Sequence, residues 1–364
     1  MAKPGTTTLR TIDLFAGAGG LSLGFELAND AASPFAFESV LAVEHDAAAA
    51  RTFKANFGST VFDADIEAFD PATYPAADVV LAGPPCQGFS PLGRDRDATS
   101  RARLNKLWCY CVEAIRRVRP RAFVIENVPQ FHRSAEFAEL LRLLRTDAAL
   151  RRYRYSFGTL NAADYGVPQA RRRGILVAAD DRDVPWPPEP THGPASASGL
   201  AHRTVRDAIS DLPRRPTTDR PVMDGDRQDL HIRRNPRPTS VERYRAVPAG
   251  GNRFDLQRNR PDLTPACWAN KPTGTTDVMG RLWWDRPAQT IRTEFFKPEK
   301  GRYLHPAHHR PITHREAARL QSFPDTFVIE GTKTEVARQI GNAVPPLLGR
   351  AIARHVAQIL ADDG

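Results

Sequence analysis

Cys86 lies directly after a predicted strand, a position at which enzymes with a central sheet often carry a nucleophile. Cys86 follows the apolar run 78–82 within the sequence Gly-Pro-Pro-Cys-Gln-Gly-Phe-Ser at 83–90. Prolines fix the backbone and remove competing donors, so a thiol after such a strand is expected to point outward. An isolated cysteine is more often a small buried residue, but the polar neighbours Gln87 and Ser90 argue against a core position for Cys86. We therefore predict that Cys86 does covalent chemistry.

A glycine-rich turn follows the first apolar run of the chain. The sequence Asp-Leu-Phe-Ala-Gly-Ala-Gly-Gly-Leu at 13–21 lies between a predicted strand and a helical segment at 21–28. Glycines there let the backbone approach a ligand at the carboxyl end of a sheet. The dinucleotide fingerprint fails because Ser22 stands three residues after Gly19, and a phosphate-binding P-loop fails because no lysine is present. The turn predicts a cofactor loop of another kind.

Acidic residues at the ends of the next two strands suggest a nucleoside ligand. Glu44 ends the second run, where it can accept both hydroxyl groups of a ribose. Asp65 and Ile66 end the third run and offer a carboxylate to an exocyclic amine and an aliphatic face to adenine. Each acidic residue taken singly reads as a solvated strand end. Together with Asp13, however, Glu44 and Asp65 make three acidic residues, one at each of three successive strands. This register favours a ligand that contains adenosine without a pyrophosphate.

The elements that position these residues alternate between strand and helix. Six short apolar runs lie at 9–15, 39–44, 59–62, 78–82, 121–125 and 174–178. Such alternation predicts a doubly wound α/β sheet. The clearest helix spans 103–118, where apolar residues recur every three or four positions. Its cysteines, Cys109 and Cys111, are predicted to lie in the core.

The amino-acid composition changes after about residue 183. From 186 to 285 the chain is rich in Pro, Arg, Gly and Asp, and 205–209 is the only clear helical turn. This stretch is interpreted as a separate, loop-rich, basic module.

Regular structure returns near the C-terminus. Thr313 and Glu316 predict a capping box at a helix start, and a last helix is expected over 346–360. We therefore expect a first domain over 1–185, a second over 186–311, and a segment over 312–364 that returns to the first.

Composition narrows the class of partner. The 364 residues carry a net charge of +9, and only seven of the 51 basic residues are lysine. Arginine presents a planar fork that matches phosphates and guanine edges, which favours nucleic acid over a membrane. No window approaches the roughly 18 apolar residues of a membrane span. Since the N-terminus also lacks an apolar leader segment, we expect a cytoplasmic protein.

The cysteines and histidines do not predict a metal site. The four cysteines form no Cys-x-x-Cys pair, which favours reduced thiols. The only histidine cluster, His305, His308 and His309, has no cysteine or carboxylate pattern beside it.

Six motifs, in this order, resemble those of DNA cytosine-5 methyltransferases. They are the stretches 13–20, 83–90, 126–128, 169–173, 315–324 and 339–344. The resemblance covers 9–180 and about 286–355 and leaves the basic module as the family's variable target-recognition region. It implies a Rossmann-like class I methyltransferase sheet with helices on both faces, plus a smaller loop-rich target-recognition domain. It also implies S-adenosylmethionine as the cofactor and duplex DNA as the partner.

The resemblance gives roles to individual residues. Cys86 attacks carbon 6 of a flipped cytosine, and Glu126 binds its N3 and exocyclic amine. Arg171 and Arg173, alternating on a strand that begins near Gln169, share one face and serve the base carbonyl and the scaffold. The expected cofactor contacts are Phe15, Gly17, Gly19, Gly20, Leu21, Glu44, His45, Asp65, Ile66, Pro84, Asn342 and Val344. The expected substrate contacts are Pro85, Gln87, Ser90, Gln169 and Arg253. His45 departs from the bulky apolar residue often found there in the family.

Three other functions share part of this pattern. A methyltransferase of the same family that acts on tRNA is the nearest, and the long 186–285 module favours DNA over it. A catalytically silent relative would have lost Cys86, Glu126 or a cofactor glycine, and all are present. A nicotinamide-dependent dehydrogenase needs the missing dinucleotide fingerprint.

The candidate DNA contacts of the basic module are Arg233, Arg234, Arg253 and Arg281. We also expect a monomer that pairs functionally with a restriction endonuclease.

Overall fold

The chain forms two compact units in the computed structural model. The structure describes all residues except 1–6, 31–32, 34, 86–102, 270–272 and 362–364. The first unit comprises Met1–Gly166, Arg172–Leu200 and Val344–Gly364, and the second comprises Val167–Arg171 and Ala201–Ala343.

These boundaries differ from those expected at 185 and 311. Residues 312–343 pack inside the second unit, where α10 (His314–Leu320) is buried against α6 (Val205–Ile209). The chain returns to the first unit only at Val344. The capping box of Thr313 and Glu316 is confirmed, but the helix that it starts belongs to the second unit.

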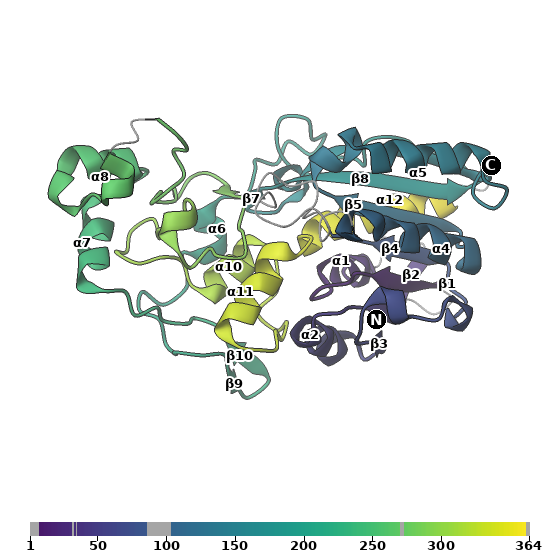
Figure 1. The fold of residues 1–364 in the computed structure, drawn as a ribbon, viewed down its shortest axis with the longest axis horizontal. Helices are drawn as coiled ribbons and strands as arrows, with labels where there is room; N and C mark the ends of the chain where they lie inside the picture. The colour runs from purple at the N-terminus through teal and green to yellow at the C-terminus, as the bar shows by residue number, and fades with distance from the viewer. Residues whose placement is uncertain (1–6, 31–32, 34, 86–102, 270–272, 362–364) are drawn as a thin grey trace. The chain divides into compact units, whose positions relative to one another are not determined.

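A seven-stranded sheet forms the centre of the first unit, with strand order β3-β2-β1-β4-β5-β8-β6 (Figure 1). Its strands are β1 (Thr7–Leu14), β2 (Phe35–Val43), β3 (Thr60–Phe62), β4 (Val79–Ala82), β5 (Ala122–Asn127), β6 (Tyr153–Asn161) and β8 (Arg172–Asp180). The first five strands pair in parallel, while β8 runs antiparallel to both of its neighbours. This strand order, with helices on both faces, is the α/β sheet that the resemblance predicted, so the predicted fold class is confirmed.

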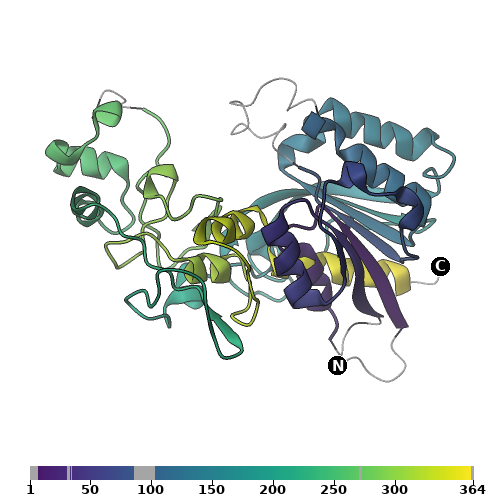
Figure 2. The same ribbon diagram turned by 60° about the horizontal axis from the view of Figure 1, so that its bottom comes forward.

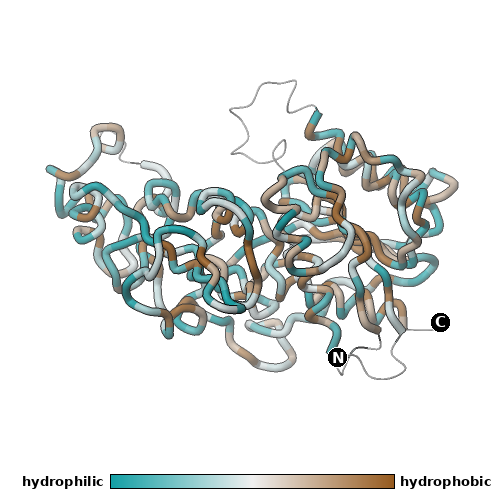
Figure 3. Tube along the Cα trace, turned by 90° about the horizontal axis from the view of Figure 1, so that it is seen from below, coloured by the Kyte–Doolittle hydropathy of each residue, from teal (hydrophilic) through white to brown (hydrophobic). Residues whose placement is uncertain are grey.

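Helices cover both faces of this sheet, and Figure 2 shows α12 on the face opposite α4 and α5. The helices are α1 (Gly20–Glu26), α2 (Ala47–Phe57), α4 (Trp108–Val118), α5 (Ala135–Thr146) and α12 (Pro346–Ala361). Short 3-10 turns lie at Ile66–Ala68, Pro71–Thr73, Pro129–Arg133 and Ala162–Tyr165. The central strands β1, β4, β5 and β8 consist mostly of buried residues, and Figure 3 colours the trace by the hydropathy of each residue. The last predicted helix, α12, is confirmed.

All six predicted strands are present in this sheet, and one of its seven strands was missed. The sequence of β6, Tyr-Arg-Tyr-Ser-Phe-Gly-Thr-Leu-Asn, shows no apolar run because most of its side chains are exposed or only partly buried. The helix predicted over 103–118 is confirmed as α4 from Trp108 onward. Cys111 is buried in the core as predicted, but Cys109 is exposed, so its core assignment was wrong.

The N-terminal and C-terminal parts of the first unit meet through two glycines. Helices α1 and α12 pack so closely that a Cβ added to Gly24 would lie 2.5 Å from the Cα of Gly349. The C-terminal helix is thereby fixed against the element that follows the glycine-rich turn.

We expect Gly24→Ala to lower the free energy of unfolding of the first unit by about 1–3 kcal/mol, because the helix backbones must separate. The better helix propensity of alanine offsets at most about 1 kcal/mol of this loss. Urea denaturation followed by circular dichroism measures the change. Gly349→Ala is the matched control, since its Cβ would lie 3.1 Å from the Cα of Gly24 and should destabilise less. A Gly24→Ala protein as stable as the parent would contradict this packing.

The second unit consists of short elements joined by long loops. These are β7 (Gln169–Ala170), α6, β9 (Val222–Asp224), β10 (Arg227–Asp229), α7 (Pro238–Ala246), α8 (Arg253–Asn259), α9 (Ala266–Ala269), β11 (Ala288–Gln289), α10 and α11 (Lys333–Asn342), with 3-10 turns at Pro261–Leu263 and Pro298–Lys300. The interpretation of 205–209 as the only helical turn was wrong. Helices α7 and α8 were missed because each buries very few side chains and so lacks an apolar stripe.

Buried arginines hold the loops of the second unit. The Arg281 guanidinium donates to the backbone carbonyls of Val247, Tyr244 and His305. Burial lowers its pKa to about 10. The Arg302 side chain lies over the Trp283 ring at 3.9 Å and also donates to backbone carbonyls. Arg281, predicted as a candidate DNA contact, is therefore a structural residue.

Candidate active site

The functional residues of the first unit gather at one edge of its sheet. In a parallel sheet the carboxyl ends of the strands share an edge, which is where ligands bind in open α/β folds. Asp13, Glu44 and Glu126 lie at or just beyond the ends of β1, β2 and β5, and Gly83 follows β4. Because β8 runs antiparallel, its first residues, including Arg173, reach the same edge.

The glycine-rich turn has a backbone that few other residues adopt. Phe15, Gly17 and Gly19 all have positive φ angles, of 59°, 57° and 83°. A non-glycine residue in this region is uncommon, and such conformations concentrate at ligand sites. A Cβ built on Gly17 would meet no atom within 4 Å, so the turn faces open space. A Cβ on Gly19 would instead overlap the Phe57 ring.

Glu44 holds this turn in place. One carboxylate oxygen accepts from the Gly17 backbone N–H at 2.8 Å and the other from the Asp46 N–H at 2.7 Å. The side chain is buried, yet each carboxylate oxygen can accept more than one hydrogen bond. His45 lies largely exposed beside it, and this contact raises the pKa of His45. The geometry fits the predicted nucleoside contact of Glu44.

Beneath the turn, Asp13 accepts a hydrogen bond of 2.6 Å from the Ser22 hydroxyl. Asp13 is buried, and burial raises its pKa to about 7, with the Glu44 charge adding to the effect and the Ser22 hydroxyl opposing it. This contact joins the end of β1 to α1 across the turn. The sequence did not predict this hydrogen bond. Ser22 was used there only to exclude the dinucleotide fingerprint.

The raised pKa of Asp13 predicts a loss of stability with pH. A carboxyl whose pKa is higher in the folded than in the unfolded chain favours folding below about pH 4 and loses that contribution as pH rises through about 7. We expect the free energy of unfolding to fall between pH 5 and 8 by less in Asp13→Asn than in the parent protein. Urea denaturation at a series of pH values measures both slopes. Equal slopes would contradict the assignment.

The predicted adenine contacts lie on the 3-10 turn after β3. Ile66 is buried, and Asp65 precedes it as the residue that caps the turn. The Asp65 carboxylate accepts from Arg103 at 2.6 Å and from the Glu67 N–H. The sequence placed both residues at the strand end, but β3 ends at Phe62.

Glu126 and Arg173 form the one ion pair in the described part of this edge that links two predicted catalytic residues. The Nε atom of Arg173 lies 2.7 Å from the Oε1 atom of Glu126, and both side chains are largely buried. The other carboxylate oxygen lies 3.7 Å from the position of a Cβ on Gly83, at the start of the cysteine loop. A carboxylate held by a cation at this place can recognise a polar base edge.

Asn127 fixes the start of the cysteine loop. Its side-chain amide donates to the Pro84 carbonyl at 3.1 Å, and its side-chain oxygen accepts from the Val128 N–H. Asn127 is buried and stands in the Glu-Asn-Val motif, which was the signal that could have shown its role. Pro84 is buried and Pro85 half-buried. Cys86, Gln87 and Ser90 lie outside the described residues.

Four predicted site residues belong to the second unit. Arg171 is fully buried and donates to the carbonyls of Ile291 and Gly341, both at 2.9 Å. Asn342 is exposed at the end of α11. Of the remaining predicted contacts, Val344 lies in the first unit and is buried.

The expectation that Arg171 and Arg173 share one face of a continuous strand was wrong. The strand is interrupted at Arg171, because β7 pairs in parallel with β11 while β8 pairs with β5 and β6. Arg171 therefore makes its contacts within the second unit and Arg173 within the first.

Gln169 and Arg253 have structural partners in the second unit. The Gln169 amide donates to the Gln321 side chain at 2.8 Å and accepts from the Ile291 N–H. Arg253 is buried, donates to the Thr273 carbonyl and lies over the Phe254 ring. Both side chains are occupied and shielded, so the predicted substrate contacts do not find support in this geometry.

The described residues contain no helix long and apolar enough to cross a membrane. Nor does this part of the chain hold a group of three or more histidine, cysteine or acidic side chains arranged for a metal ion.

Comparisons with known proteins find relatives that match nearly the whole chain. The chain is 32% identical over 436 aligned positions to the Type II methyltransferase M.AgeI of Thalassovita gelatinovora, which covers 96% of this chain and 99% of that protein. It is also 32% identical to the Type II methyltransferase M1.HphI of Haemophilus parahaemolyticus, over 97% of this chain and 87% of that protein.

A solved structure shares the fold. A DNA modification methyltransferase encoded within an E. coli prophage superimposes with a TM-score of 0.73 at 24% identity, over 97% of this chain and 100% of that one. The family model for C-5 cytosine-specific DNA methylases matches residues 9–358. The match supports DNA over tRNA as the substrate. The chain is therefore a member of the C-5 cytosine-specific DNA methylase family, and it is a DNA cytosine-5 methyltransferase.

Proposed function

We propose that the chain transfers a methyl group from S-adenosylmethionine to carbon 5 of a cytosine that is flipped out of duplex DNA. The observation that carries this proposal is the Glu126–Arg173 ion pair beside the start of the cysteine loop. A base inside a duplex cannot reach such a buried edge, so it must first leave the stack, at a free energy of a few kcal/mol.

The chemistry requires a nucleophile because carbon 5 of cytosine is too electron-poor to accept a methyl group. In the proposal the Cys86 thiolate adds to carbon 6, which makes carbon 5 electron-rich. Glu126 binds N3 and the exocyclic amine and stabilises the charge that develops on the ring. Arg173 holds the Glu126 carboxyl in position. After methylation, carbon 5 loses its proton to water and the bond between carbon 6 and Cys86 breaks.

The glycine-rich turn is the proposed site for S-adenosylmethionine, which supplies the methyl group when bound. Gly17 and the open space beside it allow a close approach, and Glu44 offers its remaining acceptor capacity to the ribose. Phe15, Asp65 and Ile66 are proposed to surround the adenosine, with Gly19, Gly20, Leu21, His45, Pro84, Asn342 and Val344 as further contacts. In this account Asp13 and Ser22 shape the turn without touching the ligand.

Recognition of the DNA sequence is assigned in this proposal to the second unit. Its exposed arginines, rather than the buried Arg281 and Arg253, would contact phosphates and bases. Pro85, Gln87 and Ser90 are proposed to contact the flipped base from the cysteine loop. The relatives named as Type II methyltransferases support a role beside a restriction endonuclease. We propose that the protein acts in the cytoplasm as a monomer.

Transfer of a radiolabelled methyl group tests this function. Purified protein is incubated with labelled S-adenosylmethionine and either duplex DNA or unmodified tRNA. The proposal expects label in the DNA, with the product identified as 5-methylcytosine after hydrolysis to nucleosides. Label only in the tRNA would support the alternative substrate, and label in neither would refute the activity.

A further inference from the structure

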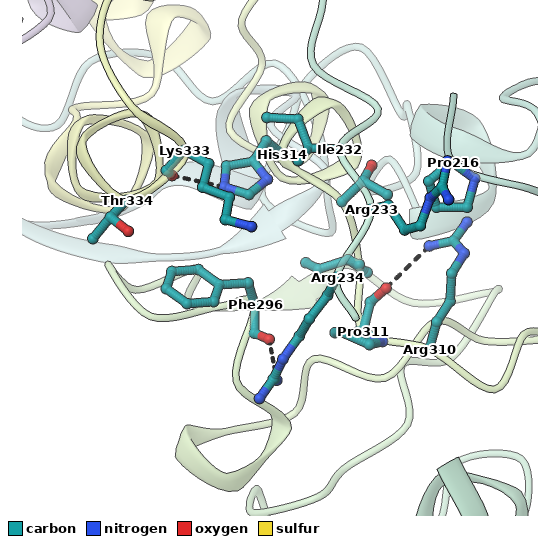
Figure 4. A pocket seen from close by; sticks show the side chains of 12 residues that line it. Pro216, Ile232, Arg233, Arg234, Phe296, Arg310, Pro311, His314, Lys333 and Thr334 are labelled. Atoms are coloured by element: carbon teal, nitrogen blue, oxygen red, sulfur yellow. Dashed lines mark hydrogen bonds between the residues drawn. The ribbon is translucent and has the colours of Figure 1, made fainter. Parts of the chain in front are cut away.

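A cavity of about 150 Å³ lies within the second unit, and none of the residues that line it belongs to the proposed catalytic site (Figure 4). Its walls come from segments far apart in the sequence, around residues 232–234, 296, 310–314 and 333–334. A cavity of this volume takes one small ring, as an engineered cavity of about 150 Å³ takes benzene. It is too small for a large cofactor, whose pockets measure about 300–1,000 Å³.

One side of the cavity suits a flat ring. Phe296 is only half-buried, and its ring lies nearly parallel to that of His314, with an angle of 14° and centroids 6.0 Å apart. Ile232 adds a buried aliphatic side chain. Figure 4 shows Phe296, His314 and Lys333 on the same side of the cavity. Aromatic rings stack on nucleic-acid bases of any kind. This side of the cavity can therefore accept the base of a nucleotide.

His314 gives the cavity a neutral ring in a fixed orientation. Its Nε2–H group donates to the Lys333 carbonyl at 2.8 Å. Burial lowers the pKa of His314 to about 4, so the ring stays neutral. The side chain is 5% exposed, and its Nδ1 atom is buried away from the cavity surface. His314 therefore contributes ring surface to the cavity rather than a hydrogen bond to a ligand.

Positive charge lies at the same cavity. The Lys333 side chain lines the cavity, and its ammonium has no ion-pair partner within the described residues. Arg233 has only a long, exposed contact of 3.5 Å to Asp219. Arg234 donates to the Phe296 carbonyl. Two cations are thus available to a phosphate beside a ring site.

We propose that this cavity binds one nucleotide with a single-ring base, whose ring packs on Phe296 and whose phosphate pairs with Lys333 and Arg233. The nucleotide can come from a DNA strand, in which case the inference rests on the proposed function, or from solution. The shared chemistry is a pyrimidine base with a phosphate.

Calorimetric titration with thymidine monophosphate tests the cavity directly, without any methyl donor. We expect binding that weakens at least about tenfold in Lys333→Gln, the loss of one charge-assisted contact, and weakens also in Phe296→Leu. Thymidine and inorganic phosphate should each bind more weakly than the nucleotide. Lys300→Gln, an exposed lysine of the same unit, is the matched control and should leave binding unchanged.

Several outcomes would overturn the proposal: no binding of thymidine monophosphate, binding that is unaffected by both cavity variants, or phosphate alone binding as tightly as the nucleotide. Glu126→Gln should leave nucleotide binding intact, so a failure of the proposed methylation chemistry can be told apart from a failure here. If duplex DNA displaces the nucleotide from the parent protein, a DNA strand is the source. If both bind together, the ligand is a free nucleotide.

Discussion

Cys86→Ser is expected to remove methyl transfer, with a loss in kcat on the order of 10⁴-fold or more, because the covalent nucleophile is lost. A serine hydroxyl is far less ionised than a thiol near neutral pH, so addition at carbon 6 fails. Single-turnover transfer of labelled methyl groups to duplex DNA measures the loss. Binding of S-adenosylmethionine should stay within about threefold of the parent, because the proposal gives Cys86 no part in holding it.

The matched control is Cys109→Ser, which replaces an exposed thiol of the same unit and should leave the rate unchanged. DNA that carries 5-fluorocytosine adds a second readout, since fluorine cannot leave carbon 5 as a proton does. The parent protein should form a covalent adduct with this DNA, and Cys86→Ser should not. An active Cys86→Ser protein, or an adduct that persists in it, would show that another residue attacks the base.

Glu126→Gln should lower kcat by about 10²–10⁴-fold, the range for loss of a group that stabilises or shares a proton in the transition state. Glutamine can still accept from Arg173, so the local geometry is kept while the carboxyl chemistry is lost. We expect a smaller change in KM for DNA, because most of the affinity comes from backbone contacts. The two constants are separated by steady-state kinetics.

Glu113→Gln is the control for this substitution. Glu113 lies on α4 and is ion-paired with Arg117, but it is far more exposed than Glu126 and has no proposed role. Its variant should methylate DNA at the parent rate. A Glu126→Gln protein with unchanged kcat would remove the carboxyl from the account of catalysis, even if Cys86 keeps its role.

The sequence predicted the sheet well because its central strands are buried on both faces. Runs such as 78–82 and 121–125 are continuously apolar, which distinguishes them from the surrounding loops. The edge strand β6 shows no such run, because most of its side chains are exposed or only partly buried. Helices α7 and α8 of the second unit were missed for a related reason, since each buries one apolar residue, Tyr244 in α7 and Leu256 in α8.

The site residues also differ in how far the sequence alone could indicate their roles. Glu44 and Glu126 were singled out because they lie at the ends of buried strands, and their roles in binding stay predictions. The roles of Arg171, Gln169 and Arg253 were harder, because nothing in the sequence tells an arginine that binds backbone carbonyls from one that binds DNA. The interruption of the strand at Arg171 depends on its pairing with β11, more than a hundred residues away.

Sequencing of bisulfite-treated DNA from cells that express the protein tests the central claim most directly. Cells without other cytosine methylation are compared with and without the expressed chain, and with Cys86→Ser as the inactive control. The account predicts 5-methylcytosine at one position of a defined sequence in the parent sample and none in the control. A genome without 5-methylcytosine, despite folded and expressed protein, would contradict it.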